Sequence, residues 1–201
     1  MKNHIKFLIY PFSFLICLLL ASCDADNEYS TWPCRFAYNN AIYLDATLAS
    51  AMTADSRGVF CKIWESAYGG VKYLNFQNNH GQSSQKVETA MEQQSGNAFM
   101  LGINNGIIVG FQVLNTQPNG GFVAYDVQCP NCVRKENNTI SPNYPVSMDS
   151  SGIATCKKCG KKYDLNNSGV VQNGEECDTG LQKYLASTTG PFGYISVGTK
   201  R

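Results

Sequence analysis

Two closely spaced cysteine pairs are the residues in this sequence best suited to chemistry. Cys129 and Cys132 form one CxxC unit, and after 23 intervening residues Cys156 and Cys159 form a second. Two cysteines three positions apart on a tight turn can direct both sulfurs at one ion, so two such units complete a tetrahedral site of four cysteines. Thiolate sulfur favours zinc, iron or an iron–sulfur cluster over magnesium or calcium. The sequence therefore predicts a metal site that holds zinc, with mononuclear iron or a [2Fe–2S] cluster as the alternative.

Two other interpretations compete for the same cysteines. A disulfide framework is open to any protein that is exported from the cytoplasm, because thiols oxidise there. Disulfide pairing gives no reason, however, for two matched CxxC units that each follow an extended segment. A thioredoxin-type redox pair requires a helix directly after Cys129, whereas the polar residues 133–145 predict a loop. Metal binding is thus favoured, and the disulfide interpretation stays open.

The first 22 residues have the pattern of a secretory signal peptide. Two lysines stand among the first six residues, and residues 7–20 are almost entirely apolar. The apolar run of about 14 residues is shorter than the roughly 20 that a transmembrane helix needs. We therefore expect residues 1–22 to be removed rather than retained as a membrane span.

The end of this leader places a cysteine at the processing site. Leu20-Ala21-Ser22-Cys23 resembles the lipobox of bacterial lipoproteins, in which the cysteine becomes the lipidated first residue of the mature chain. Two or more acyl chains anchor a protein stably at a membrane. The resemblance implies lipidation at Cys23, a lipid-anchored tether over residues 23–40, and attachment to the bacterial outer membrane or cell surface, with the periplasmic side as the alternative.

The charge balance excludes one large class of partners. The full chain has 16 basic and 15 acidic residues, and removal of the leader takes away two lysines, which leaves 14 basic and 15 acidic residues. Proteins that bind nucleic acid need an excess of positive charge to attract the phosphate backbone. We therefore expect no nucleic-acid partner.

The mature chain has the pattern of an all-β protein. Short apolar runs rich in β-branched and aromatic residues alternate with Gly and Asn turns. Strands are predicted at 41–48, 59–64, 71–76, 106–114, 122–127, 181–187 and 194–197. One short inserted helix is predicted over residues 83–94, with Ser84 as its N-cap and Gly96 as its stop.

The second half of the chain resembles a known family in the order and spacing of its motifs. The stretches that carry the resemblance are 121–130, 156–165, 169–174, 181–184 and 193–197. Together they resemble the Rieske domain, in which a strand ends at the first ligand pair and a hairpin carries the second. The resemblance implies a Rieske-like antiparallel β-sandwich or barrel over residues 41–201. It also implies a zinc-ribbon-like or rubredoxin-like metal-binding subdomain at about 127–165.

The ligand set departs from that family. A Rieske cluster is held by two cysteines and two histidines, but residues 81–201 contain no histidine. Cys132 lies one position beyond the place of the family's first ligand histidine. Cys159 occupies the place of the family's second ligand histidine. Because a CxxC unit converges on one ion, this spacing favours a mononuclear site over a two-iron cluster.

The remaining residues give no catalytic constellation. His80 is a lone histidine in a predicted loop, and paired carboxylates are not evident, so no catalytic residue is assigned. Cys34 and Cys61 flank the first predicted strands and are a possible disulfide, which leaves Cys177 unassigned. We expect a monomeric, non-catalytic binding or structural module of the cell envelope with an unidentified protein partner. The alternatives are an electron carrier with a redox partner and an adhesin held together by disulfides alone.

Overall fold

The computed structural model describes residues 28–93, 98–114, 120–136, 142–175 and 178–200. The predicted leader, the predicted lipidation site Cys23, the helix stop Gly96 and the unassigned Cys177 lie outside the described residues. Within the described part of the chain, most residues in regular structure belong to antiparallel β-strands, in agreement with the predicted all-β class. No helix there is long and apolar enough to span a membrane.

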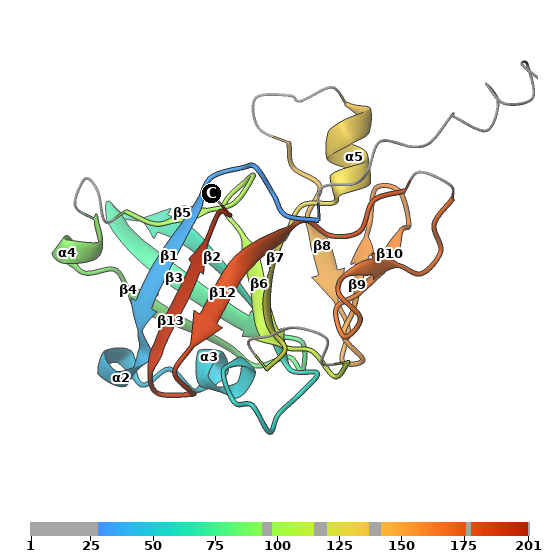
Figure 1. Ribbon diagram of the computed structural model, residues 1–201. Helices are drawn as coiled ribbons and strands as arrows, with labels where there is room; N and C mark the ends of the chain where they lie inside the picture. The colour runs from blue at the N-terminus through green and yellow to red at the C-terminus, as the bar shows by residue number, and fades with distance from the viewer. Residues whose placement is uncertain (1–27, 94–97, 115–119, 137–141, 176–177, 201) are drawn as a thin grey trace, which may run out of the picture.

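A large sheet of nine strands forms the body of the protein (Figure 1). Its strand order is β4-β3-β2-β6-β7-β12-β13-β1-β5, and every neighbouring pair is antiparallel. The strands are β1 (Cys34–Asn39), β2 (Phe60–Tyr68), β3 (Val71–Asn78), β4 (Ser83–Val87), β5 (Met100–Leu101), β6 (Ile107–Phe111), β7 (Phe122–Asp126), β12 (Lys183–Thr188) and β13 (Tyr194–Gly198).

A second, smaller sheet of four strands lies beside the large one, with helix α5 (Pro130–Lys135) next to it (Figure 1). Its strand order is β11-β10-β9-β8. The strands are β8 (Val146–Met148), β9 (Ile153–Cys156), β10 (Lys162–Asp164) and β11 (Val170–Val171). This unit overlaps the region 127–165 in which the sequence predicts a metal-binding subdomain.

Strands β6 and β7 are buried on both faces and separate two hydrophobic cores. Successive side chains of a strand point to opposite faces, so Ile107 and Val109 enter the first core while Ile108 enters the second. The first core is formed by side chains from strands of the large sheet and from the segment 46–51. The second lies between the large sheet and the small unit, and it contains Cys129 and Cys156.

The first predicted strand is wrong, because residues 41–48 form parts of two short helices and the two-residue connection between them. Helix α2 (Asn40–Tyr43) is capped by the Asn39 side chain, and α3 (Ala46–Ala51) is capped by Asp45, whose carboxylate accepts from the Leu48 amide at 2.9 Å. Such caps satisfy amides that have no partner within a helix. Strand β1 precedes both helices, so the chain enters the large sheet within the stretch that was predicted to be a tether.

The predicted helix over residues 83–94 is largely wrong. Residues 83–87 form β4, which pairs with β3 from Gln77 to Tyr73. Only α4 (Ala90–Gln93) is helical. Its start is a capping box, in which Thr89 and Glu92 exchange side-chain-to-backbone hydrogen bonds. Residues 83–87 are a strand because they pair with β3 at the edge of the large sheet, and the local sequence does not show this partner.

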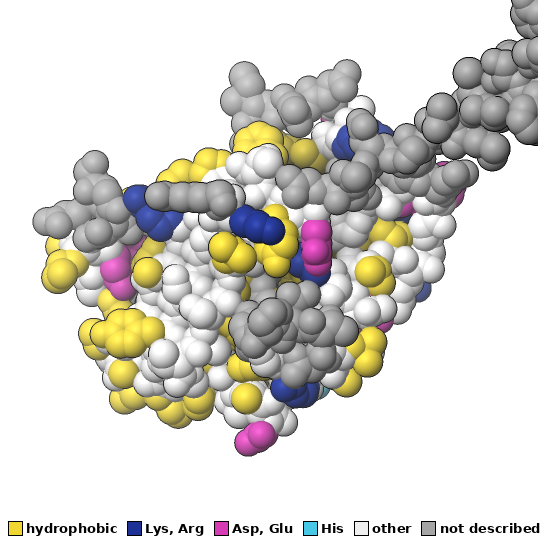
Figure 2. Space-filling view, in the orientation of Figure 1, with side chains coloured by type: hydrophobic (Ala, Val, Ile, Leu, Met, Phe, Trp, Pro, Cys, Tyr) yellow, Lys and Arg dark blue, Asp and Glu magenta, His cyan; other side chains and the backbone are white. Residues whose placement is uncertain are grey.

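One region of the molecular surface is apolar. Helix α2 contacts β13, and exposed Ile42, Leu44, Phe192 and Tyr194 belong to this region. Figure 2 shows hydrophobic side chains around α2 at the lower left, while the charged groups lie elsewhere on the same face.

Candidate metal centre

The first cysteine pair spans the start of a helix. Cys129 has extended backbone angles and precedes α5, Pro130 occupies the first helical position, and Cys132 lies inside the helix. Proline suits that position because its fixed φ fits a helix and its missing N–H would have no partner there. The loop predicted after Cys132 is therefore wrong over residues 133–135. Burial of Val133 against the protein stabilises the helix despite the polar residues that follow it.

The second pair lies on the hairpin between β9 and β10. Cys156 ends β9, and Cys159 follows in the turn. The turn closes through a hydrogen bond of 2.8 Å from the Gly160 amide to the Cys156 carbonyl. Gly160 has a φ of +73°, which glycine adopts more easily than other residues. This local geometry turns Cys159 back toward Cys156.

The structure brings all four predicted ligands together. No two of the four sulfurs of Cys129, Cys132, Cys156 and Cys159 are more than 4.8 Å apart. The Cys129 and Cys159 sulfurs are 3.6 Å apart, and those of Cys132 and Cys156 are 3.8 Å apart. A tetrahedron with Zn–S bonds of about 2.3 Å has edges of about 3.8 Å. All four thiols are free in the structure, so the group has the dimensions of a site for a single ion.

The spacing also bears on the kind of metal centre. In a two-iron cluster, the thiolates bind in pairs to different irons, with bridging sulfides between them. Sulfurs bound to different irons are then farther apart than sulfurs bound to one ion, because the distance between the two irons adds to their separation. The four sulfurs here form one compact group. The geometry therefore supports a mononuclear ion better than a [2Fe–2S] cluster.

The four thiols differ in their exposure. Cys129, Cys132 and Cys156 are buried, and Cys159 is exposed. Burial raises the pKa of Cys129 to about 11, although a hydrogen bond with Tyr163 lowers it, and burial raises the pKa of Cys132 even more. Burial also opposes ionisation of Cys159, but hydrogen bonds from the Lys161 amide and the other thiols lower its pKa below the ordinary value. A bound cation is what would keep the buried sulfurs ionised.

Two buried polar side chains support the first cysteine pair. The Tyr163 hydroxyl lies 2.9 Å from the Cys129 sulfur and 3.0 Å from the side-chain nitrogen of Asn131. Neither residue was predicted from the sequence. The signal for Tyr163 is its place between Lys162 and Asp164 on β10, since alternation of polar and apolar residues marks an inward-facing side chain.

Basic residues are concentrated around the cysteines. Between residues 129 and 165 the chain has six lysines and arginines but three acidic residues. Lys158 pairs with Glu136 at 2.8 Å, and Lys161 pairs with Asp178. Four thiolates with one divalent ion carry a formal charge of −2. The surrounding positive charge therefore favours the metal-bound form of the site.

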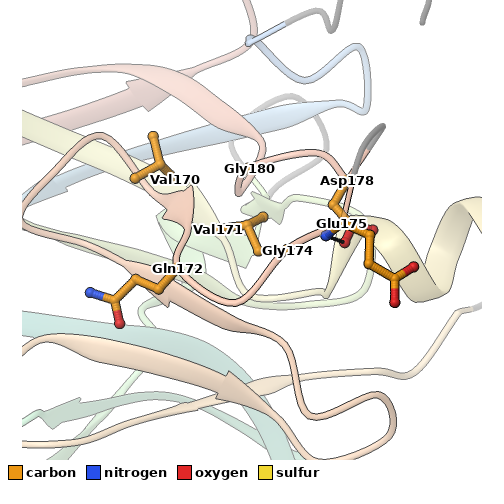
Figure 3. Close-up of a pocket in the computed structure, with 7 residues that line it drawn as sticks. All are labelled: Val170, Val171, Gln172, Gly174, Glu175, Asp178 and Gly180. Atoms are coloured by element: carbon orange, nitrogen blue, oxygen red, sulfur yellow. Dashed lines mark hydrogen bonds between the residues drawn. The ribbon is translucent and has the colours of Figure 1, made fainter.

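An open pocket of about 370 Å³ lies between β11 and the segment that leads to β12 (Figure 3). Its described lining residues are Val170, Val171, Gln172, Gly174, Glu175, Asp178 and Gly180. The Asp178 carboxylate accepts from the Glu175 amide at 2.6 Å and pairs with Lys161. No cysteine or histidine is among these lining residues, so the pocket adds no ligand to the metal site.

The other singled-out residues do not join the site. Cys34 and Cys61 are both buried in the first core, and both thiols are free, so the suggested disulfide is not present in the structure. His80 is exposed in a turn, where its amide donates to the Asn78 side chain at 3.1 Å. The part of the chain that the structure describes thus contains one cluster of metal-binding side chains.

Comparison with known proteins adds no relative. No protein-family model matches the chain, and no curated protein or solved structure is significantly similar to it.

Proposed function

We propose that this chain is a lipid-anchored protein of the bacterial cell envelope in which one zinc ion, bound by Cys129, Cys132, Cys156 and Cys159, has a structural role. The observation that carries the proposal is the close grouping of the four sulfurs, which all lie within 4.8 Å of one another. The ion would join helix α5 to the β9–β10 hairpin. These two elements come from separate parts of the chain and share the second core.

A non-catalytic role is supported by the completeness of the ligand set. Catalytic zinc sites have three protein ligands and leave a fourth position for water or substrate, whereas structural sites have four protein ligands. Four cysteine sulfurs would fill the tetrahedron here. We therefore propose a binding or structural module whose partner is another envelope component.

The proposed architecture is Rieske-like, with both ligand histidines replaced by cysteines. Two features support it. Strand β7 ends shortly before the first cysteine pair, and the β9–β10 hairpin carries the second pair. Attachment to the membrane through Cys23 is supported by the apolar leader and the lipobox-like residues that end it.

Metal analysis tests this proposal directly. The protein is purified without added metal, its metal content is measured by mass spectrometry, and its visible spectrum is recorded. We expect about one zinc per chain and no visible absorption, because zinc has a filled d shell. Two irons per chain with a charge-transfer band would overturn the structural-zinc proposal. So would metal-free protein in which the four cysteines are oxidised.

One observation favours an electron carrier as the second candidate. Cys159 is exposed while the other three thiols are buried, so one ligand of the centre reaches the surface, where a redox partner can approach. A single iron bound to four thiolates would suit this role. One iron per chain, with a visible band that bleaches reversibly on reduction, would establish it.

A further inference from the structure

Asn131, between the two cysteines of the first pair, is held in a single orientation. Its side chain is almost completely buried, with an exposed fraction of 1%. The Thr179 amide donates to the Asn131 side-chain oxygen at 3.0 Å, and the Asn131 side-chain nitrogen donates to the Thr179 carbonyl at 2.9 Å. A backbone N–H can only donate and a carbonyl can only accept. The two backbone groups therefore fix which end of the amide is nitrogen.

This orientation determines the direction of the next hydrogen bond. The Asn131 nitrogen also lies 3.0 Å from the Tyr163 hydroxyl oxygen, which must accept from it. The hydroxyl hydrogen of Tyr163 is then free to point at the Cys129 sulfur, 2.9 Å away. A metal-bound thiolate has no proton to donate, so it can only accept from Tyr163.

We infer that Asn131 is a positioning residue of the metal centre, through which the segment 178–180 controls the hydrogen bond that Tyr163 donates to the Cys129 sulfur. The inference rests on the proposed metal-binding function. A hydrogen bond to a ligand sulfur withdraws electron density from it and so changes the metal–sulfur bond. The segment 178–180 also contacts the β9–β10 hairpin. Its Asp178 forms an ion pair with Lys161, which lies two positions after Cys159 in that hairpin.

A purely structural role for Asn131 makes a different prediction. If Asn131 only fastened the segment to α5, its loss would lower stability without changing the electronic state of the centre. If it positions Tyr163, its loss would change the metal–sulfur bond as loss of the tyrosine hydroxyl does. Asn131→Leu separates the two, because it removes the donor to the Tyr163 oxygen and offers no new acceptor. The carboxylate of Asn131→Asp would instead accept from Tyr163 and draw the hydroxyl hydrogen away from the sulfur, so it shows the effect of a reversed hydrogen bond.

The test uses the full protein loaded with Co²⁺ in place of zinc. The sulfur-to-cobalt charge-transfer band is measured in the wild type, Tyr163→Phe, Asn131→Asp, Asn131→Leu and the double variant Asn131→Leu with Tyr163→Phe. We expect all variants to move the band to lower energy, because a thiolate whose hydrogen bond is lost or weakened gives up charge more easily. The shift should be largest in Tyr163→Phe, which removes the hydroxyl itself. The double variant should match Tyr163→Phe alone. Zinc affinity should fall about tenfold in each.

Thr179→Val is the matched control, because it keeps the two backbone hydrogen bonds to Asn131 and removes only a weak hydroxyl contact of 3.4 Å. Its band should stay at the wild-type energy. Asn131→Leu keeps the test decisive if the buried carboxylate of Asn131→Asp prevents folding. A band that moves in Tyr163→Phe but not in Asn131→Leu would overturn the inference. Failure of the wild type to bind Co²⁺ would instead overturn the proposed metal site.

Discussion

The ammonium group of Lys183, at the start of β12, forms an ion pair with the carboxylate of Glu28, 155 positions earlier in the chain. The Lys183 side chain is only 4% exposed, whereas that of Glu28 is 54% exposed. Backbone hydrogen bonds accompany the pair, from the Lys183 amide to the Glu28 carbonyl at 3.0 Å and from the Ser30 amide to the Lys183 carbonyl at 2.8 Å. Residues before β1 are therefore part of the fold.

Removal of this N-terminal segment should destabilise the protein. In a chain that begins at Trp32, Lys183 would lose its carboxylate partner and the backbone hydrogen bonds to Glu28 and Ser30. An unpaired buried charge is costly, but the exposure of Glu28 reduces the effect, so we expect a loss of about 2 kcal/mol relative to a chain that begins at Asp24. Urea unfolding of the two chains measures the difference.

Lys183→Met distinguishes the ion pair from the backbone contacts. In the shortened chain, this substitution removes the unpaired charge and should recover part of the lost stability. In the longer chain, it should recover nothing, because Glu28 already neutralises Lys183 there. Equal stability of the chains that begin at Asp24 and Trp32 would contradict the structural role of this segment.

Loss of one proposed metal ligand should loosen the small sheet and leave most of the large one intact. Structural zinc contributes on the order of 10 kcal/mol in small domains that fold only with metal, but here the first core lies in the large sheet and does not include the ligands. We expect Cys156→Ser to lose the metal and the hydrogen-exchange protection of β9 and β10. Strands β2 and β3 should keep their protection.

Cys61→Ala is the matched control for that experiment. Cys61 is also a buried free thiol, but it lies in the first core, away from the four ligands. Its substitution should reduce overall stability while the metal content stays at the wild-type level. The structural role of the metal would be refuted by a Cys156→Ser protein that lost its metal but kept full protection of β9 and β10.

The grouping of the four cysteines was predictable because its signal is local. A CxxC unit places two sulfurs near one point whatever the rest of the fold does. The pairing of two such units over 23 residues then predicted one site, and the four sulfurs are within 4.8 Å of one another. Most of the strands of the large sheet were predicted for a similar reason, since β6 and β7 are continuous apolar runs bounded by turn residues.

The failed predictions concern elements that depend on distant partners. Helix α5 is short and polar at its end, and burial of Val133 in the protein stabilises it. Strand β4 has alternating exposure and no buried side chain, so only its pairing with β3 identifies it. The Asn131 hydrogen bonds join residues 48 positions apart along the chain, and no local pattern predicts them.

The stability of the protein should depend on pH through Asp126. This carboxyl group is buried and accepts hydrogen bonds from the Tyr184 hydroxyl and from the amides of Ile103 and Gln128. Burial raises the pKa of Asp126 from 3.8 to about 6, although these hydrogen bonds lower it. The folded state therefore binds a proton more tightly than the unfolded state. Its contribution to stability is present below about pH 4 and is lost as the pH rises to about 6, by roughly 2 kcal/mol.

Asp126→Asn isolates this effect because its amide does not titrate. The free energy of unfolding of the wild type minus that of Asp126→Asn should fall by roughly 2 kcal/mol between pH 4 and about pH 6.5. Taking the difference cancels the contributions of other groups, including acid release of a bound metal. Asp55→Asn, at an exposed aspartate, controls for the loss of a negative charge. A difference that stays constant over this range would show that Asp126 has no such linkage.

The thiols of Cys34 and Cys61 should be unreactive in the folded protein and reactive once it unfolds. Cys34 is 6% exposed and Cys61 is completely buried. Burial and the nearby Asp126 carboxylate raise the pKa of Cys34 to about 12, and burial raises that of Cys61 further, so neither forms the thiolate that attacks alkylating reagents. Iodoacetamide near neutral pH should label neither cysteine in the native protein, as measured by peptide mass spectrometry.

The same reagent should label both cysteines in denaturant without reductant. If both stay unlabelled in denaturant until a reductant is added, they form the disulfide that the sequence suggested, and the two free thiols of the structure are wrong.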